Sequence, residues 1–123
     1  MKKAKTKDQR IFNPITHCEK EYPDTVKVFQ KIMVEEYELF CHKQSDYGPS
    51  NIAMGTQLKT EADVNLSLAA LVVRMNDKCQ RLVNLVVRNN NRKAQNEPAR
   101  DCFVDLSVYG IIAQIVERGS WGQ

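Results

Sequence analysis

The stretch from Asn96 to Val116 constrains the fold of this chain more than any other part of the sequence. Three acids, Glu97, Asp101 and Asp105, follow one another at four-residue steps and should form one column along a helix. Because like charges in such a column repel one another, we expect a divalent metal ion or basic side chains beside it. Apolar side chains recur here at the three- and four-residue spacing of a buried helix face. They are Cys102, Phe103, Leu106, Tyr109, Ile112 and Val116.

Two earlier segments show the same helical periodicity. The first helix is expected to start at Asp24 or Thr25 and to end before Gly48. Its apolar stripe consists of Val26, Phe29, Ile32 or Met33, Tyr37 and Phe40. The second helix is expected to start at a Thr60 cap and to run to about Arg88. Its apolar stripe consists of Leu68, Leu71, Val72, Met75, Cys79, Leu82, Val83 and Val86.

Turn-forming residues separate these helices and mark their ends. The third helix is expected to be capped by Asn96, with Glu97 and Pro98 in its first turn. Gly119 is expected to stop it. Residues 48–60 contain two glycines and a proline, so we expect a loop with defined turns that could close over a ligand.

These segments predict an all-α fold, a compact bundle of three main helices with a short N-terminal arm. Residues 24–119 form the helical domain and residues 1–23 a basic, flexible, extended arm with a short turn around Pro14. Residues 120–123 form a tail, in which Trp121 is expected to pack back onto the bundle. Each helix is apolar over a wide arc, so we expect oligomerisation, as a homodimer or a larger assembly, to complete the core.

The composition, with 42% hydrophobic and 27% charged residues, is that of a folded soluble protein. No apolar run approaches the roughly 20 residues of a membrane span, and no signal-peptide pattern follows the basic start, so we expect a cytoplasmic protein without membrane partners. The first ten residues carry five basic side chains and one acid, so the net charge of +3 resides in the arm. The four cysteines show neither zinc-finger nor disulfide-framework spacing, and Cys79 and Cys102 are expected to be buried.

Charged side chains from all three helices are expected to meet around one cavity. Carboxylates from separate helices of a bundle build sites for divalent ions, and their hard oxygen atoms suit Mg²⁺ or Mn²⁺. Basic residues beside such an ion would bind the phosphates of a ligand. Acids and bases around one cavity indicate a nucleotide–metal site rather than a nucleic-acid groove, so direct nucleic-acid binding is not expected. The acids are Glu35, Glu36, Glu38, Glu97, Asp101 and Asp105, and the bases are Lys43, Arg74, Lys78 and Arg81.

Plainer interpretations of the same residues stay open. The acids of the first helix would then form a solvated face, and Tyr109 would be a core residue. Asp101 and Asp105 lie beside the apolar face and need partners, so either a functional role or a salt bridge to Arg74 or Arg81 is expected. The second helix would carry an ordinary ion-pair ladder. Its members would be Arg74, Asp77, Lys78 and Arg81.

Three segments resemble, in order, the blocks of one known family. KQSDYGPSNI carries the pattern K-x-x-DYG, and RMNDKCQRLVNL carries R-x-x-DK-x-x-RL. NEPARDCFVDLSVYGII resembles E-S-x-x-D-x-x-x-DL-x-x-Y, with Pro98 at the small polar position. Over about residues 29–117 the chain thus resembles the nucleotide modification associated domain 1 family, small helical proteins of phages and bacteria. The resemblance implies a role in phage nucleotide or DNA-base modification, in the host cytoplasm. It implies nucleotide and phosphate contacts at Lys43, Asp46, Tyr47, Arg74, Asp77, Lys78, Arg81 and Tyr109.

That family is in turn similar to the all-α nucleotide pyrophosphohydrolases of the MazG type, in which acids of two helices hold magnesium. There, a metal-activated water splits a nucleoside triphosphate into monophosphate and pyrophosphate. The similarity implies Mg²⁺, with Mn²⁺ as the alternative, and makes Glu38 and Asp101 catalytic. The first helix reads E-E-x-E rather than E-E-x-x-E, and the third reads E-x-x-x-D rather than E-x-x-D, so two ligand sets stay open. Glu35 and Glu38 would act with Asp101, or Glu38 with Glu97 and Asp101, and Asp105 completes the candidate metal ligands.

Two functions follow for the nucleotide site. The first is Mg²⁺-dependent hydrolysis of a nucleoside triphosphate, modified or not, to monophosphate and pyrophosphate. The second is a non-catalytic protein that binds or sequesters a nucleotide and so acts against a host nucleotide signal. The sequence leaves open whether the chain is an enzyme, and a structural helical oligomer without a ligand is a third interpretation.

Overall fold

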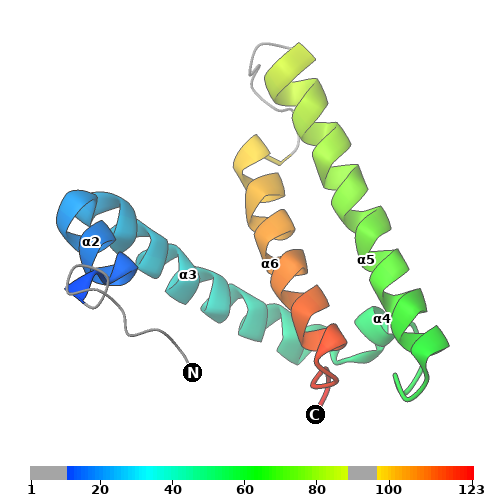
Figure 1. Cartoon of the computed structure of the whole chain (residues 1–123). Coiled ribbons are helices and arrows are strands. Elements are labelled where there is room, and N and C mark those ends of the chain that lie inside the picture. The colour runs from blue at the N-terminus through cyan, green and yellow to red at the C-terminus, as the bar shows by residue number, and fades with distance from the viewer. Residues whose placement is uncertain (1–10, 89–96) are drawn as a thin grey trace, which may run out of the picture. The chain divides into compact units, whose positions relative to one another are not determined.

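The computed structural model describes residues 11–88 and 97–123, and every regular element within these ranges is helical. This confirms the all-α class that the periodicity predicts. None of these helices combines the length and the apolar character that a membrane span requires. The Asn96 cap and the basic first ten residues lie outside the described residues. The elements are α2 (Pro14–Glu21), α3 (Pro23–Tyr47), α4 (Ser50–Ala53), α5 (Glu61–Leu82), the π-helical turn η1 (Val83–Arg88) and α6 (Ala99–Glu117), as Figure 1 shows.

The chain divides into two compact units, Met1–Glu38 and Leu39–Gln123, and α3 runs from the first into the second. In the first unit, α2 begins where the Asn13 side chain accepts hydrogen bonds from the amides of Ile15 and Thr16, at 2.9 and 3.3 Å. Pro14, at the first helical position, has no N–H to leave unpaired. The prediction of an extended arm with only a short turn is therefore wrong here, because Asn-Pro is a strong helix-start signal.

The apolar stripe predicted on α3 is mostly exposed. The helix has the predicted bounds within one residue, but none of its residues is buried. Phe29, Met33 and Tyr37 are exposed, whereas Val26 and Phe40 are half-buried. The periodicity thus predicted the helix correctly and its burial wrongly, because an apolar stripe is buried only where another element covers it.

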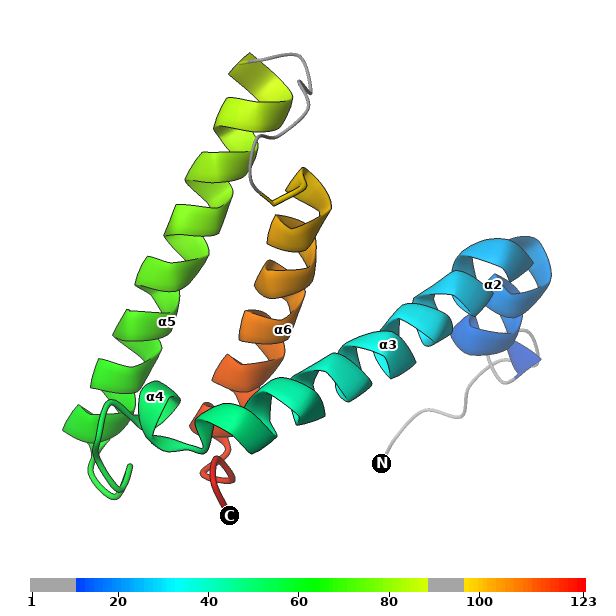
Figure 2. The same cartoon turned by 180° about the vertical axis from the view of Figure 1, so that it is seen from behind.

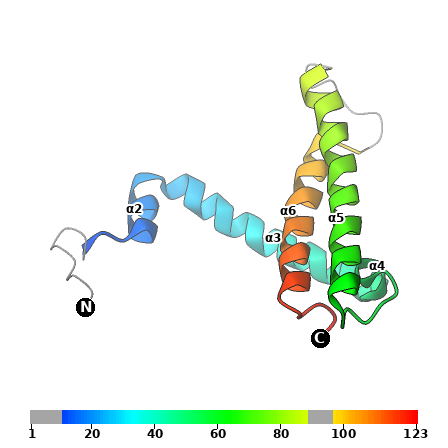
Figure 3. The same ribbon diagram turned by 45° about the vertical axis from the view of Figure 1, so that its right-hand side comes forward.

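The second unit is built on α5 and α6, which lie side by side in every view (Figure 1, Figure 2 and Figure 3). The side chains of α5, α6 and α4 form its core, together with the end of the chain, where Trp121 packs back as predicted and is only 5% exposed. Its indole lies edge-on to the ring of Phe40, with 6.0 Å between ring centroids. The buried apolar residues of this core are Ile52, Ala53, Leu71, Ile112, Val116 and Trp121.

The segment predicted as a loop, residues 48–60, contains the short helix α4. Gly48 ends α3 in the left-handed conformation, with φ of +67°, which costs glycine little. Three side chains then hold α4 in place by donating to carbonyl groups of this helix and of its N-cap residue Pro49. Ser67 Oγ donates to the carbonyl of Ile52 at 2.6 Å, and Trp121 Nε1 donates to that of Pro49 at 3.0 Å. Arg74 Nη2 donates to the carbonyl of Asn51 at 3.2 Å.

The long helices bury narrower faces than predicted. On α5, Leu71 is buried as expected, but Cys79 is exposed. On α6, Cys102 is buried as expected, but Phe103 is 59% exposed. Each helix has neighbours over only part of its circumference, so the outer edges of the predicted stripes face solvent. Two further members of the predicted stripe are exposed, Val72 on α5 and Val86 on η1.

The start of α6 corrects the predicted acid column. Pro98 is the N-cap residue, with φ −63° and ψ 153°, so Glu97 precedes the helix. A residue before proline is disfavoured in the helical conformation, because the proline ring crowds its backbone. Glu97 is therefore not in column with Asp101 and Asp105. At its other end α6 finishes at Glu117, just before Gly119 adopts φ of +73°.

Candidate functional site

A cavity of about 350 Å³ opens within the second unit, between the last turns of α3, the start of α4, and the facing sides of α5 and α6. Its volume lies at the lower end of the range of about 300–1,000 Å³ that small-molecule pockets occupy. One part of the lining is aromatic and aliphatic, and consists of Leu39, Phe40, Tyr47, Ile52, Val108, Tyr109 and Ile112. The other part is polar, and consists of Lys43, Gln44, Asn51, Arg74 and Asp105.

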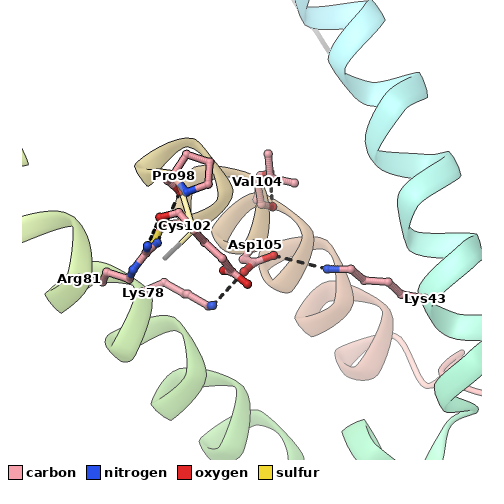
Figure 4. A network of polar contacts seen from close by, with 9 residues as sticks. Lys43, Lys78, Arg81, Pro98, Cys102, Val104 and Asp105 are labelled. Atoms are coloured by element: carbon pink, nitrogen blue, oxygen red, sulfur yellow. Dashed lines mark hydrogen bonds and ion pairs between the residues drawn. The ribbon is translucent and has the colours of Figure 1, made fainter. Parts of the chain in front are cut away.

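Asp105 is the centre of the polar lining and joins three helices. Its Oδ2 atom lies 3.0 Å from Nζ of Lys78 on α5, and its Oδ1 atom lies 3.8 Å from Nζ of Lys43 on α3 (Figure 4). The side chain of Asp105 is 19% exposed, that of Lys78 is 27% exposed and that of Lys43 is 56% exposed. Each carboxylate oxygen thus faces its own ammonium group, and the contact with Lys78 is the closer and less exposed of the two.

The expected salt bridge of Asp105 is present, but not to Arg74 or Arg81. The helices α5 and α6 run antiparallel, so a step along one matches an equal step back along the other. Arg81 on α5 accordingly contacts Cys102 on α6. Lys78 lies three residues before Arg81, and it contacts Asp105, which lies three residues after Cys102. The register of the two helices therefore selects the lysine as the partner.

Asp105 also stabilises the protonated form of Lys78. The hydrogen bond from Lys78 to Asp105, together with the negative charge of that carboxylate, raises the pKa of Lys78 above its usual value of 10.5. Partial burial acts in the opposite direction but is the smaller effect. Lys78 is therefore a stable cation. The single charge of Asp105 neutralises only part of the positive charge of Lys43, Lys78 and Arg74.

Arg81 has a structural role at the start of α6. Its guanidinium donates to Sγ of Cys102 at 3.1 Å and to the carbonyl of Pro98 at 3.5 Å (Figure 4). It also donates to the carbonyl of Glu97. These bonds tie the first turn of α6 to α5. Arg81 does not line the cavity, so its predicted phosphate contact is not supported by its position.

The other predicted binding residues divide into two groups. Those that line the cavity are Lys43, Tyr47, Arg74, Asp105 and Tyr109, and Lys78 is connected to them through Asp105. Asp46 and Asp77 are exposed and do not line it. Asp101 is half-buried one turn before Asp105, and among the described residues no basic side chain forms an ion pair with it.

The predicted metal ligands are not brought together by what the structure describes. Glu35 and Glu38 belong to the first unit, where both are exposed and Glu35 lies 4.0 Å from Lys31. Within residues 11–88 and 97–123, no three His, Cys, Asp or Glu side chains form a group that could hold a metal ion. We therefore derive no catalytic step through magnesium, and the metal site stays a prediction.

Two polar residues of the cavity, Gln44 and Asn51, are not among the predicted site residues. Asn51 is notable because its Oδ1 atom is buried and has no hydrogen-bond partner among the described residues. Both residues lie in the segment KQSDYGPSNI, so the first family-like block contained the signal. Helical periodicity gave no reason to select them, since Asn51 lies in the segment predicted as a loop.

No protein-family model matches this chain, and neither the curated proteins nor the solved structures yield a significant match. The resemblance to the nucleotide modification associated domain 1 family therefore stays a prediction. The chemistry of the cavity is the basis for a functional proposal.

Proposed function

We propose that this chain binds a nucleotide in the cavity of its second unit. One observation carries the proposal: the same cavity combines an excess of cationic side chains with an aromatic and aliphatic lining. Nucleotides need both, because their phosphates are anionic and their bases are flat and weakly polar. The family resemblance supports the same class of ligand and implies a role in nucleotide or DNA-base modification.

The phosphate end is assigned to Lys43 and Arg74. Lys43 is more than half exposed and its contact to Asp105 is long, at 3.8 Å, so its ammonium group can turn to a ligand at small cost. Arg74 donates from Nη2 to the carbonyl of Asn51, and its guanidinium has further N–H groups that can donate to a ligand. Among the described residues no carboxylate forms an ion pair with Arg74. A phosphate group would supply the missing anion.

The base end is assigned to the aromatic lining. Tyr47 ends α3 and is largely exposed, whereas Tyr109 is half-buried on α6. Stacking of a base on an aromatic side chain contributes about 1–3 kcal/mol and tolerates any base, because every base has a π-face. These two tyrosines therefore account for affinity, and the identity of the base must depend on polar groups near them.

Two outcomes for the bound nucleotide stay open as proposals. In the first, the protein hydrolyses a nucleoside triphosphate with Mg²⁺, an ion that commonly takes one or two carboxylates and completes its shell with water and substrate phosphates. Asp101, which lacks an ion-pair partner among the described residues, is the carboxylate to test. In the second, the protein only binds or sequesters the nucleotide. The ion pairs of Asp105 with two lysines favour binding without hydrolysis, because a carboxylate held by two ammonium groups is a poor metal ligand.

The discriminating experiment is a thermal-shift screen of nucleoside mono-, di- and triphosphates and cyclic nucleotides, with Mg²⁺ or with EDTA, followed by chromatography of the recovered ligand. A binder is stabilised equally in EDTA and releases its ligand intact. A hydrolase needs Mg²⁺ and yields monophosphate, and Asp101→Asn should then abolish turnover while leaving the melting temperature close to that of the wild type. Turnover retained by Asp101→Asn would remove Asp101 from the site.

A matched pair of lysine variants tests the cavity itself. A charge-assisted hydrogen bond contributes about 1.5–3 kcal/mol, so Lys43→Met should weaken nucleotide binding by roughly 10- to 100-fold. Lys59→Met removes the same charge from an exposed residue that does not line the cavity, and should leave affinity nearly unchanged. Equal losses in both variants would indicate a non-specific charge effect, and no nucleotide binding by the wild type would refute the proposal.

We also propose that the chain forms a homo-oligomer through exposed apolar helix faces. On α5, Leu66 and Val73 are exposed and stand seven residues apart, the repeat of a coiled-coil seam. Sedimentation at several concentrations should show an assembly larger than 14.1 kDa, which Val73→Glu dissociates. Asn65→Glu, at an exposed position of α5 without a large apolar side chain, should not dissociate it. A wild type that is monomeric at all concentrations would refute this assembly.

A further inference from the structure

The strongest unassigned feature of the molecule is a buried acceptor at the edge of the cavity. Oδ1 of Asn51 has less than 1 Å² of exposed surface and no donor among the described residues. A buried carbonyl oxygen without a donor is costly, and native proteins rarely retain one without a reason. Other atoms of Asn51 line the cavity, so a turn of its amide group would bring Oδ1 to a donor on a ligand there.

The backbone that carries Asn51 is fixed from several sides. Arg74 holds the carbonyl of Asn51 itself, Ser67 holds that of Ile52 and Trp121 holds that of Pro49. These donors come from α5 and from the end of the chain, so α4 is positioned by the core of the unit. The backbone under this side chain is pre-organised, so binding needs to order only the side chain.

The neighbours of Asn51 limit what the donor can be. Tyr47 and Tyr109 line the same cavity and offer aromatic faces, while Lys43 and Arg74 offer positive charge. A nucleobase is flat, stacks on aromatic faces, and carries N–H donors in its own plane at its edge. An asparagine amide suits such an edge, because its oxygen accepts from an N–H group while its NH₂ group donates to a ring nitrogen or carbonyl.

We propose that Asn51 reads the edge of the base, its Oδ1 accepting a hydrogen bond from an N–H group of the nucleobase. This inference rests on the proposed nucleotide binding and adds the residue that makes it selective for the base. The terminal torsion of an asparagine side chain is soft, so rotation of the amide brings the covered oxygen to the cavity. In this arrangement Lys43 and Arg74 contact the phosphate groups, and Tyr47 and Tyr109 stack on the faces of the base.

The test uses ligands whose base edge lacks an N–H group. Adenosine and guanosine 5′-monophosphates are compared with the 5′-monophosphate of unsubstituted purine riboside, and the cytidine and uridine compounds with that of pyrimidin-2-one riboside. Calorimetric titration of the full chain should show that at least one natural nucleotide binds about 5- to 100-fold more tightly than its analogue, the range of one lost hydrogen bond to a buried group. A wild type that binds both members of every pair equally overturns the assignment.

Variants then locate the effect at Asn51. Asn51→Leu removes the acceptor at similar size and should reduce the preference for the natural base to within about twofold, in line with the loss of a single hydrogen bond. Asn65→Leu makes the same change at an exposed position of α5 outside the cavity and should retain the full preference. A preference that survives in Asn51→Leu, with the helical circular dichroism of the wild type, overturns the assignment. The comparison of natural and analogue ligands on the wild type stands even if Asn51→Leu fails to fold.

Probes that lack a nucleobase separate this inference from the function on which it rests. Ribose 5-phosphate and pyrophosphate carry the anionic groups without a base, and they should bind the wild type and Asn51→Leu equally. If these probes bind but no base preference exists, the cavity is an anion site and only the inference fails. If ribose 5-phosphate loses affinity in Asn51→Leu as much as the nucleotide does, Asn51 contacts a sugar hydroxyl and the inference is wrong. If neither these probes nor any nucleotide binds, both the proposed function and the inference are refuted.

Discussion

Replacing Asp105 by asparagine tests the centre of the site, because the amide has the size of the carboxylate but not its charge. Two limits bracket the cost. Breaking a fully buried ion pair by removing one partner costs about 3–5 kcal/mol, whereas an exposed pair contributes about 0–1 kcal/mol. The side chains of Asp105 and Lys78, at 19% and 27% exposed, lie between these limits. Lys43, at 56% exposed, lies near the exposed limit and adds little.

We therefore expect Asp105→Asn to lower the free energy of unfolding by about 1–2 kcal/mol, which for a small unit lowers the melting temperature by roughly 4–16 °C. Thermal and urea unfolding, followed by circular dichroism, would measure both quantities. Glu117→Gln removes the same charge from an exposed position of α6, where no basic side chain of the described residues forms an ion pair with it. It should change the free energy of unfolding by no more than about 0.5 kcal/mol.

A double-mutant cycle shows which lysine accounts for the stability that Asp105→Asn loses. Combined with Lys78→Met, Asp105→Asn should show a coupling of about 1 kcal/mol or more, and combined with Lys43→Met a coupling of less than about 0.5 kcal/mol. If Asp105→Asn is as stable as Glu117→Gln, or if its coupling to Lys78 is zero, the reasoning is refuted. If Mg²⁺ alone raises the melting temperature of the wild type but not that of Asp105→Asn, Asp105 is a metal ligand instead.

Three further outcomes follow from the same contacts. The folded chain raises the pKa of Lys78, so its stabilising contribution should be complete below the usual value of 10.5 and decline as the pH rises through the higher folded value. Urea unfolding followed from about pH 9 to above about pH 11 should therefore show no loss of this contribution below 10.5, and above it a steeper loss of stability in the wild type than in Lys78→Met. Trp121→Phe should lower the free energy of unfolding by about 1–3 kcal/mol, because it removes the indole donor to Pro49 and part of a buried ring. Ser67→Ala should lower it by about 1 kcal/mol in the same unfolding assay, because the bond of this fully buried hydroxyl to α4 is lost.

Much of the helical structure could be predicted because its signals are local. Thr60 caps α5 by accepting a hydrogen bond from the amide of Asp63 at 3.1 Å, as its position in the sequence indicates. Gly48 and Gly119 adopt positive φ at the ends of α3 and α6, where a glycine has no Cβ to strain. The short helices α2 and α4 were missed because periodicity needs several turns to become visible, and neither has them.

The burial of the helices was predicted less well, because it depends on neighbours that periodicity does not identify. Phe29 and Phe103 occupy apolar positions at helical spacing, yet both are exposed. The same limit applies to the site. Asp105 was recognised as an acid in need of a partner, but the choice of Lys78 follows from the antiparallel register of α5 and α6. Asn51 becomes prominent only through an unpaired atom, which no spacing rule detects.

The cavity residues that are proposed to bind a nucleotide also hold the second unit together, so binding would be linked to the folding of this unit. Arg74 holds α4 through Asn51, and Asp105 connects α3 to α5 through its two lysines. A nucleotide that engages these groups requires the assembled unit, so it binds the folded state and not the unfolded chain. Its contribution to stability is then RT ln(1 + [L]/Kd), or about 2.7 kcal/mol at a hundredfold excess over Kd. That exceeds the contribution expected for the Asp105–Lys78 pair, so at this excess Asp105→Asn, if it still binds, should be more stable with the nucleotide than the wild type is without it.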